Sequence, residues 1–115
     1  MVGDWVSCDG KNYQIAEIGG MVCLDAEKEI FASLEDITPI HITPEILEKN
    51  GWHIPKHKIW YQNDDVTFYM CRYTDGTYEI YTDGESEYSN FCNIRFVHEL
   101  QHALKLCGID KEIKL

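Results

Sequence analysis

Apolar and polar residues alternate in short runs over residues 2–42, and turn residues separate the runs. The pair Asp9-Gly10 is a turn signal of the kind that β-hairpins prefer. The runs with strand character are Trp5-Val6, Tyr13–Ile18, Met21–Leu24, Ile30-Phe31 and Ile37–Ile42. Because no helical pattern interrupts these runs, the segment predicts a small SH3-like β-barrel or meander.

A short helix is predicted between Ile42 and Trp52. Thr43 suits the N-cap, Pro44 suits the first helical position, and Gly51 stands just past the expected end. About two turns of helix are stable only when packed against something larger. We therefore expect this helix to link the first lobe to the second.

Extended patterns follow at Ile59–Tyr61, Val66–Tyr73, Thr77–Tyr81 and Phe91–Phe96, and they predict three or four strands. The Asp75-Gly76 turn joins Val66–Tyr73 to Thr77–Tyr81 and predicts an antiparallel sheet. Aromatic residues fall on both faces of this sheet, so one set should be buried and the other partly exposed. Ordinary cross-strand pairing explains such aromatics, and so does a binding surface. The residues that we select for a binding surface are Tyr69, Arg72, Tyr78 and Arg95.

Residues Val97 to Cys107 predict an amphipathic helix. At about 100° per residue, one stripe carries Val97, Leu100, Ala103, Leu104 and Cys107. Gly108 suits a left-handed C-cap. The complete pattern predicts an α+β protein of one domain, 1–115, with possible lobes at 1–42 and 43–115. The second lobe would be a helix followed by an antiparallel sheet packed by the terminal helix.

The string His98-Glu99-Leu100-Gln101-His102 matches the helical zinc-protease motif, in which two histidines bind zinc and the glutamate activates water. The longer metzincin pattern needs glycine where Lys105 stands and a third histidine where Gly108 stands. A third ligand is therefore not evident. We expect no enzyme activity, metal or cofactor, and keep as an alternative a zinc-dependent hydrolase with His98 and His102 as ligands and Glu99 as base.

The formal charge is −10, from 20 acidic against 10 basic residues. Such a field repels phosphate backbones, which argues against direct nucleic-acid binding. The negative charge either serves solubility alone or suits a basic protein, and a protein is the expected partner. No apolar run approaches the ~18 residues of a membrane span, and no export signal opens the chain. The five widely spaced cysteines do not form a C-x-x-C pair, which is typical of a reduced cytoplasmic protein. The sequence does not indicate an oligomeric state.

The chain contains three distinctive strings, GDWV near its start, LEDITPIHITPEILEKNGW in the middle and NIRFVHELQHALKLCGI near its end, and they carry a resemblance that covers nearly the whole chain. In these strings the protein resembles a family of short uncharacterised proteins of gut-type bacteria and their prophages. Many members carry glutamine at the position of Glu99 and asparagine at that of His102, so the resemblance implies a function without zinc catalysis. We expect a non-catalytic binding module acting on a host protein. A small-molecule or nucleotide-binding protein remains the other alternative, with Arg72 and Arg95 as contacts.

Overall fold

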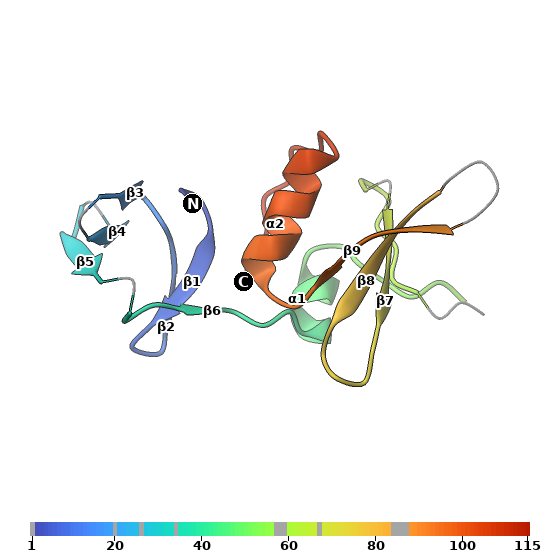
Figure 1. Ribbon diagram of the computed structural model, residues 1–115, viewed down its shortest axis with the longest axis horizontal. Coiled ribbons are helices and arrows are strands. Elements are labelled where there is room, and N and C mark those ends of the chain that lie inside the picture. The colour runs from blue at the N-terminus through green and yellow to red at the C-terminus, as the bar shows by residue number, and fades with distance from the viewer. Residues whose placement is uncertain are drawn as a thin grey trace. The chain divides into compact units, whose positions relative to one another are not determined.

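The computed structural model describes residues 2–19, 21–25, 27–33, 35–56, 60–66, 68–83 and 88–115. For residues 82, 83 and 88–92 it describes the backbone alone. The chain divides into two compact units (Figure 1). Unit 1 comprises Met1–His41 with Phe96–His98, and unit 2 comprises Ile42–Arg95 with Glu99–Leu115. The lobe boundary predicted from the sequence lies one residue from the break between His41 and Ile42.

Unit 1 consists of two antiparallel sheets of three strands each. The first has the order β2-β1-β6, with β1 at Trp5–Cys8, β2 at Lys11–Gln14 and β6 at Thr38–Pro39. The second has the order β3-β4-β5, with β3 at Glu17–Ile18, β4 at Val22–Asp25 and β5 at Ile30–Ala32.

The predicted turn at Asp9-Gly10 is confirmed. Cys8 pairs with Lys11 across a two-residue loop, in which Asp9 has φ 49° and Gly10 φ 77°. Two consecutive positive φ angles are the geometry of a type I′ turn, whose twist matches that of the flanking strands.

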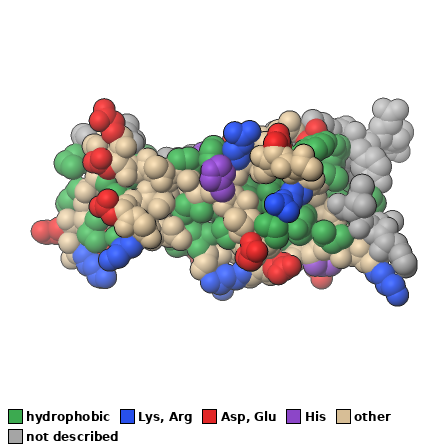
Figure 2. Space-filling model, turned by 90° about the horizontal axis from the view of Figure 1, so that it is seen from below, with side chains coloured by type: hydrophobic (Ala, Val, Ile, Leu, Met, Phe, Trp, Pro, Cys, Tyr) green, Lys and Arg blue, Asp and Glu red, His purple; other side chains and the backbone are tan. Residues whose placement is uncertain are grey.

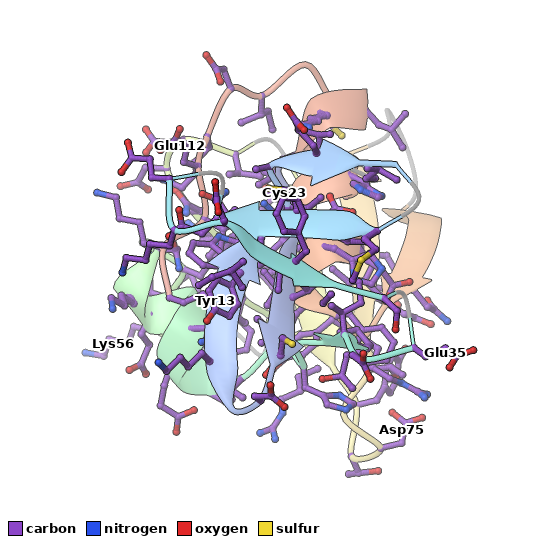
Figure 3. All side chains as sticks on the ribbon, turned by 90° about the vertical axis from the view of Figure 1, so that its left-hand side faces the viewer. Tyr13, Cys23, Glu35, Lys56, Asp75 and Glu112 are labelled. Carbon is purple, nitrogen blue, oxygen red and sulfur yellow. The ribbon has the colours of Figure 1, made fainter. Side chains whose placement is uncertain are left out.

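The core of unit 1 contains side chains from both sheets and from Ile15, which follows β2: Val6, Ile15, Val22, Leu24 and Ala32 are all buried. Tyr13 packs against this cluster from β2, and Figure 3 shows its ring beside the strands of the unit. The strands that the structure describes form two sheets without closing into a barrel, so the SH3-like closure stays a prediction.

The described residues of unit 2 form two helices and one antiparallel sheet, which confirms the α+β class. Helix α1 spans Pro44–Lys49. The sheet has the order β7-β8-β9, with β7 at Phe68–Arg72, β8 at Tyr78–Asp83 and β9 at Tyr88–Ile94. Helix α2 spans Val97–Leu106, and its first two residues belong to unit 1.

The predicted stripe of α2 is confirmed: Val97, Leu100, Ala103 and Leu104 are at most 3% exposed, whereas Leu106 is 77% exposed. Cys107 is half-buried. The sheet contributes buried side chains to the same unit, and these are Phe68, Met70, Tyr78, Ile80 and Ile94. Apolar side chains also remain at the surface among charged ones, as one face shows in Figure 2.

Both helices of the described chain end as their glycines predict. In α1, Gly51 N donates to Glu48 O and Trp52 N donates to Leu47 O, while Gly51 has φ 88°. These two bonds around a left-handed residue are a Schellman motif. The same pattern ends α2, where Ile109 N donates to Leu104 O and Gly108 has φ 72°.

A buried polar cluster fastens the end of α1 to the C-terminal segment. The Asn50 side chain donates from Nδ2 to Ile46 O at 2.8 Å and to Lys114 O at 2.7 Å, and its Oδ1 accepts from Lys114 N at 2.7 Å. Asn63 Nδ2 donates to the Asn50 carbonyl at 2.9 Å. Asn50 and Asn63 are 8% and 5% exposed, so these bonds satisfy groups that water scarcely reaches.

Candidate binding site

Strand alternation separates the aromatic residues of the β7–β8 hairpin into two faces. Phe68 and Met70 of β7 are at most 1% exposed, so the residues between and after them, Tyr69 and Cys71, point to the other side of the sheet. Tyr69 pairs with Tyr81, and Cys71 pairs with Glu79, in the antiparallel register. The half-exposed residues therefore form one continuous outer face.

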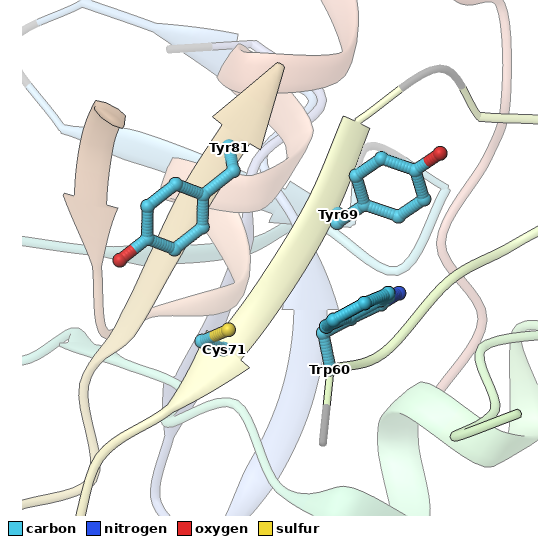
Figure 4. A pocket seen from close by; sticks show the side chains of 4 residues that line it. All are labelled: Trp60, Tyr69, Cys71 and Tyr81. Carbon is cyan, nitrogen blue, oxygen red and sulfur yellow. The ribbon is translucent and has the colours of Figure 1, made fainter. Parts of the chain in front are cut away.

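A pocket of about 210 Å³ opens on this outer face, lined by Trp60, Tyr69, Cys71 and Tyr81. Trp60 and Tyr69 meet in a T-shaped arrangement, with ring centroids 6.0 Å apart and an angle of 60° between the planes. Figure 4 shows the two rings close together, with Cys71 on β7 and Tyr81 on β8. The pocket thus brings three aromatic rings to the surface of unit 2.

The Glu79 carboxylate belongs to the residue opposite Cys71 in the register, next to the lining of the pocket. The Tyr73 hydroxyl lies 3.4 Å from the Tyr81 hydroxyl. A hydrogen bond to the Glu79 carboxylate raises the pKa of Tyr73 to about 12, with smaller effects of burial and of negative charge at Glu79 and Asp75. Burial raises the pKa of the Cys71 thiol, and the Glu79 charge adds to that rise. Both raised pKa values mean that the ionised forms of Tyr73 and Cys71, which would add a negative charge beside Glu79, are disfavoured.

The four residues selected from the sequence do not form one surface. Tyr69 lines the pocket, but Tyr78 faces the core and is 0% exposed, which corrects its assignment to the exposed face. Arg72 lies opposite Tyr78 in the register and is exposed at the end of β7. Arg95 is exposed just after β9. Hydrogen bonds from Thr77 lower the pKa of Asp75, and the charge of Arg95 adds a smaller effect in the same direction. Neither arginine lines the aromatic pocket.

Sequence reasoning did not select three lining residues: Trp60, Cys71 and Tyr81. Cys71 stands two residues after Tyr69 on β7, and Tyr81 stands two residues after Glu79 on β8. Once Met70 is assigned to the core, this spacing places Cys71 and Tyr81 on the outer face. Trp60 lies outside the strands. Its neighbour Tyr61 forms an isolated bridge with Met70, with both backbone hydrogen bonds present, and this contact places Trp60 beside β7.

The residues of the zinc-type motif have local structural contacts. Glu99 Oε1 accepts a hydrogen bond from Arg95 N at 3.0 Å, so its carboxylate caps the start of α2. The His98 ring stacks on Phe96 with centroids 5.8 Å apart and planes 9° apart, and Phe96 also contacts His41. His102 is half-buried on α2. Among the described residues, no group of three or more His, Cys, Asp or Glu side chains is placed to hold a metal ion.

No protein-family model matches the chain, and neither a curated protein nor a solved structure matches it. Within the part of the chain that the structure describes, no helix has the length and apolar character needed to cross a membrane.

Proposed function

We propose that the protein is a non-catalytic binding module that holds a protein partner on the outer face of the β7–β8 hairpin. The observation that supports this proposal is the pocket of Trp60, Tyr69 and Tyr81, three aromatic side chains that stay half-exposed on the side of the β7–β8 hairpin opposite to the buried Phe68, Met70, Tyr78 and Ile80. Aromatic anchors in a surface pocket contribute most to binding energy at protein interfaces.

The size of the pocket favours one side chain of a larger partner over a free ligand. Pockets for drug-sized ligands enclose about 300–1,000 Å³, and this one encloses about 210 Å³. A nucleotide also needs donors for its phosphates. Arg72 and Arg95 do not line the pocket, so the nucleotide alternative gains no support from them.

The charge of the chain indicates the character of the partner. A net charge of −10 favours a protein with a basic surface and opposes nucleic acid. If the resemblance to prophage proteins reflects common origin, the partner is a cytoplasmic protein of the bacterial host. We therefore propose that the outer face docks on a basic patch of such a protein.

Affinity capture with matched variants tests this proposal. Wild-type protein, Tyr81→Ala and Phe31→Ala would be immobilised and exposed to bacterial lysate at physiological salt. Phe31 is a suitable control because it is a 53% exposed aromatic residue of unit 1. We expect a protein that the wild type and Phe31→Ala retain and Tyr81→Ala loses. Equal retention by all three, or retention of nothing by the wild type, contradicts the proposal.

A further inference from the structure

The aromatic pocket has the features of a site for a positively charged group. The faces of aromatic rings carry partial negative charge, and cations are attracted to them, most strongly to tryptophan. Trp60, Tyr69 and Tyr81 supply three rings around one pocket, and no basic side chain is among the described residues that line it. Among the described lining residues, a cation entering the pocket would meet aromatic surface and the Cys71 side chain.

Carboxylate charge lies next to Cys71, one of the residues that line the pocket. Glu79 is opposite Cys71 in the strand register, and Tyr73 donates a hydrogen bond to it. A carboxylate has about four acceptor positions, so one phenol does not saturate it. Asp75 adds negative charge near Tyr73, although Arg95 lies close enough to act on Asp75. The pKa values of Tyr73 and Cys71 are both raised in part by the Glu79 charge, as expected for a region that favours cations.

Arginine fits this combination better than lysine. Its planar guanidinium stacks on aromatic rings and directs several N–H groups toward a carboxylate, and it is less strongly hydrated than an ammonium group. A guanidinium among the three rings could stack and also bond to Glu79, the carboxylate next to the pocket. Lysine would gain the cation–π attraction without the planar stacking.

We propose that the pocket of Trp60, Tyr69, Cys71 and Tyr81 receives an arginine side chain from a basic segment of the partner protein, with Glu79 accepting from the guanidinium. This inference rests on the proposed function, because it names the chemical group that the outer face would bind.

Short capped peptides with one variable central residue test the inference without the partner. Glycine and serine would fill the other positions, and the central residue would be arginine, lysine, citrulline or norleucine. Citrulline keeps the shape of arginine and removes its charge. Binding would be followed by the NMR signal of the Trp60 indole N–H, identified by its loss in Trp60→Phe.

We expect the arginine peptide to bind about fivefold more tightly than the citrulline peptide, with lysine between them. Glu79→Gln should reduce this preference for arginine at least about twofold. Glu35→Gln removes the same charge from an exposed site in unit 1, labelled in Figure 3, and should leave the preference unchanged. The NMR spectrum of each variant would show that it is folded.

Equal or tighter binding of the citrulline or norleucine peptide overturns the inference. So does an unchanged Trp60 signal at millimolar arginine peptide. Either result can coexist with a captured partner that Tyr81→Ala loses, in which case the outer face binds protein through an uncharged side chain. If the preference for arginine is absent and no partner is captured that Tyr81→Ala loses, the proposed function is contradicted as well.

Discussion

Replacing Asn50 by alanine should destabilise the protein by about 2–4 kcal/mol, because this side chain connects α1 to the C-terminal segment. The substitution removes two hydrogen bonds donated by Nδ2 and one accepted by Oδ1. Each contributes about 0.5–1.5 kcal/mol net, and the carbonyl and amide groups left behind are partly shielded from water. For a two-state chain of 115 residues, a loss near 3 kcal/mol corresponds to a melting temperature lower by roughly 10 °C.

Urea unfolding followed by tryptophan fluorescence measures this loss, since Trp52 is 1% exposed and lies two residues beyond Asn50. Asn12→Ala is the matched control. Asn12 is exposed on β2, so its replacement should change the unfolding free energy by less than about 0.5 kcal/mol. Hydrogen exchange at the Lys114 amide should accelerate in Asn50→Ala, because that N–H loses its acceptor.

The Asn50→Asp variant distinguishes lost bonds from lost volume. A carboxylate keeps the shape but offers no N–H to Ile46 O and Lys114 O, the two carbonyls that Nδ2 now serves. Its ionised form is disfavoured there, so the folded-state pKa of the new carboxyl should be raised and the variant should gain stability as the pH falls. A change below about 0.5 kcal/mol in Asn50→Ala would refute this account of the buried cluster.

Three further predictions concern single positions. Tyr78→Phe should stabilise the protein by about 1 kcal/mol in urea unfolding, because the buried Tyr78 hydroxyl has no hydrogen-bond partner among the described residues; a loss of stability would indicate a bound partner. Gly108→Ala should cost about 1 kcal/mol, because alanine disfavours the left-handed backbone of this position. No clash adds to that cost, since the new Cβ would have no atom within 4 Å. Gly51→Ala should cost more, because its Cβ would also lie 3.3 Å from Asn63 Nδ2; equal costs would contradict this reasoning. Ultraviolet titration should find Tyr73 ionising near pH 12, and Glu79→Gln should return the pKa of Tyr73 toward 10. Because the folded-state pKa is raised, the contribution of Tyr73 to stability is present below pH 10 and is lost as the pH rises toward 12.

Local chemistry in the sequence was enough to predict much of the fold. Thr43 caps α1 by accepting from Ile46 N, Gly51 and Gly108 end the two helices, and Asp9-Gly10 forms the first hairpin. Each of these features depends on residues within a few positions of one another. Side-chain and backbone preferences therefore act without help from the rest of the chain.

The features that were missed depend on distant contacts. The outer face could not be assigned because aromatic residues occupy both faces of β8, and only burial shows that Tyr78 is internal while Tyr81 is not. The bonds between Asn50 and Lys114 join residues 64 positions apart. No local pattern encodes such a pair.

The zinc-type motif shows that a local sequence pattern can suggest a chemistry that only the structural contacts of its residues can test. The sequence shows two histidines and a glutamate at the spacing that zinc proteases use. Only the structure shows that Glu99 accepts from Arg95 N and that His98 stacks on Phe96. A short motif is therefore compatible with helix capping and ring stacking as well as with chemistry.

The most direct test of the outer face as a binding site uses Cys71, which lines the pocket. Alkylation would be followed at each cysteine by mass spectrometry, with and without a saturating amount of the captured partner. Cys8, a half-buried thiol of unit 1, serves as the internal control. We expect the partner to slow alkylation of Cys71 at least about tenfold and to leave the alkylation rate of Cys8 unchanged. Equal rates at Cys71 with and without the partner would contradict it.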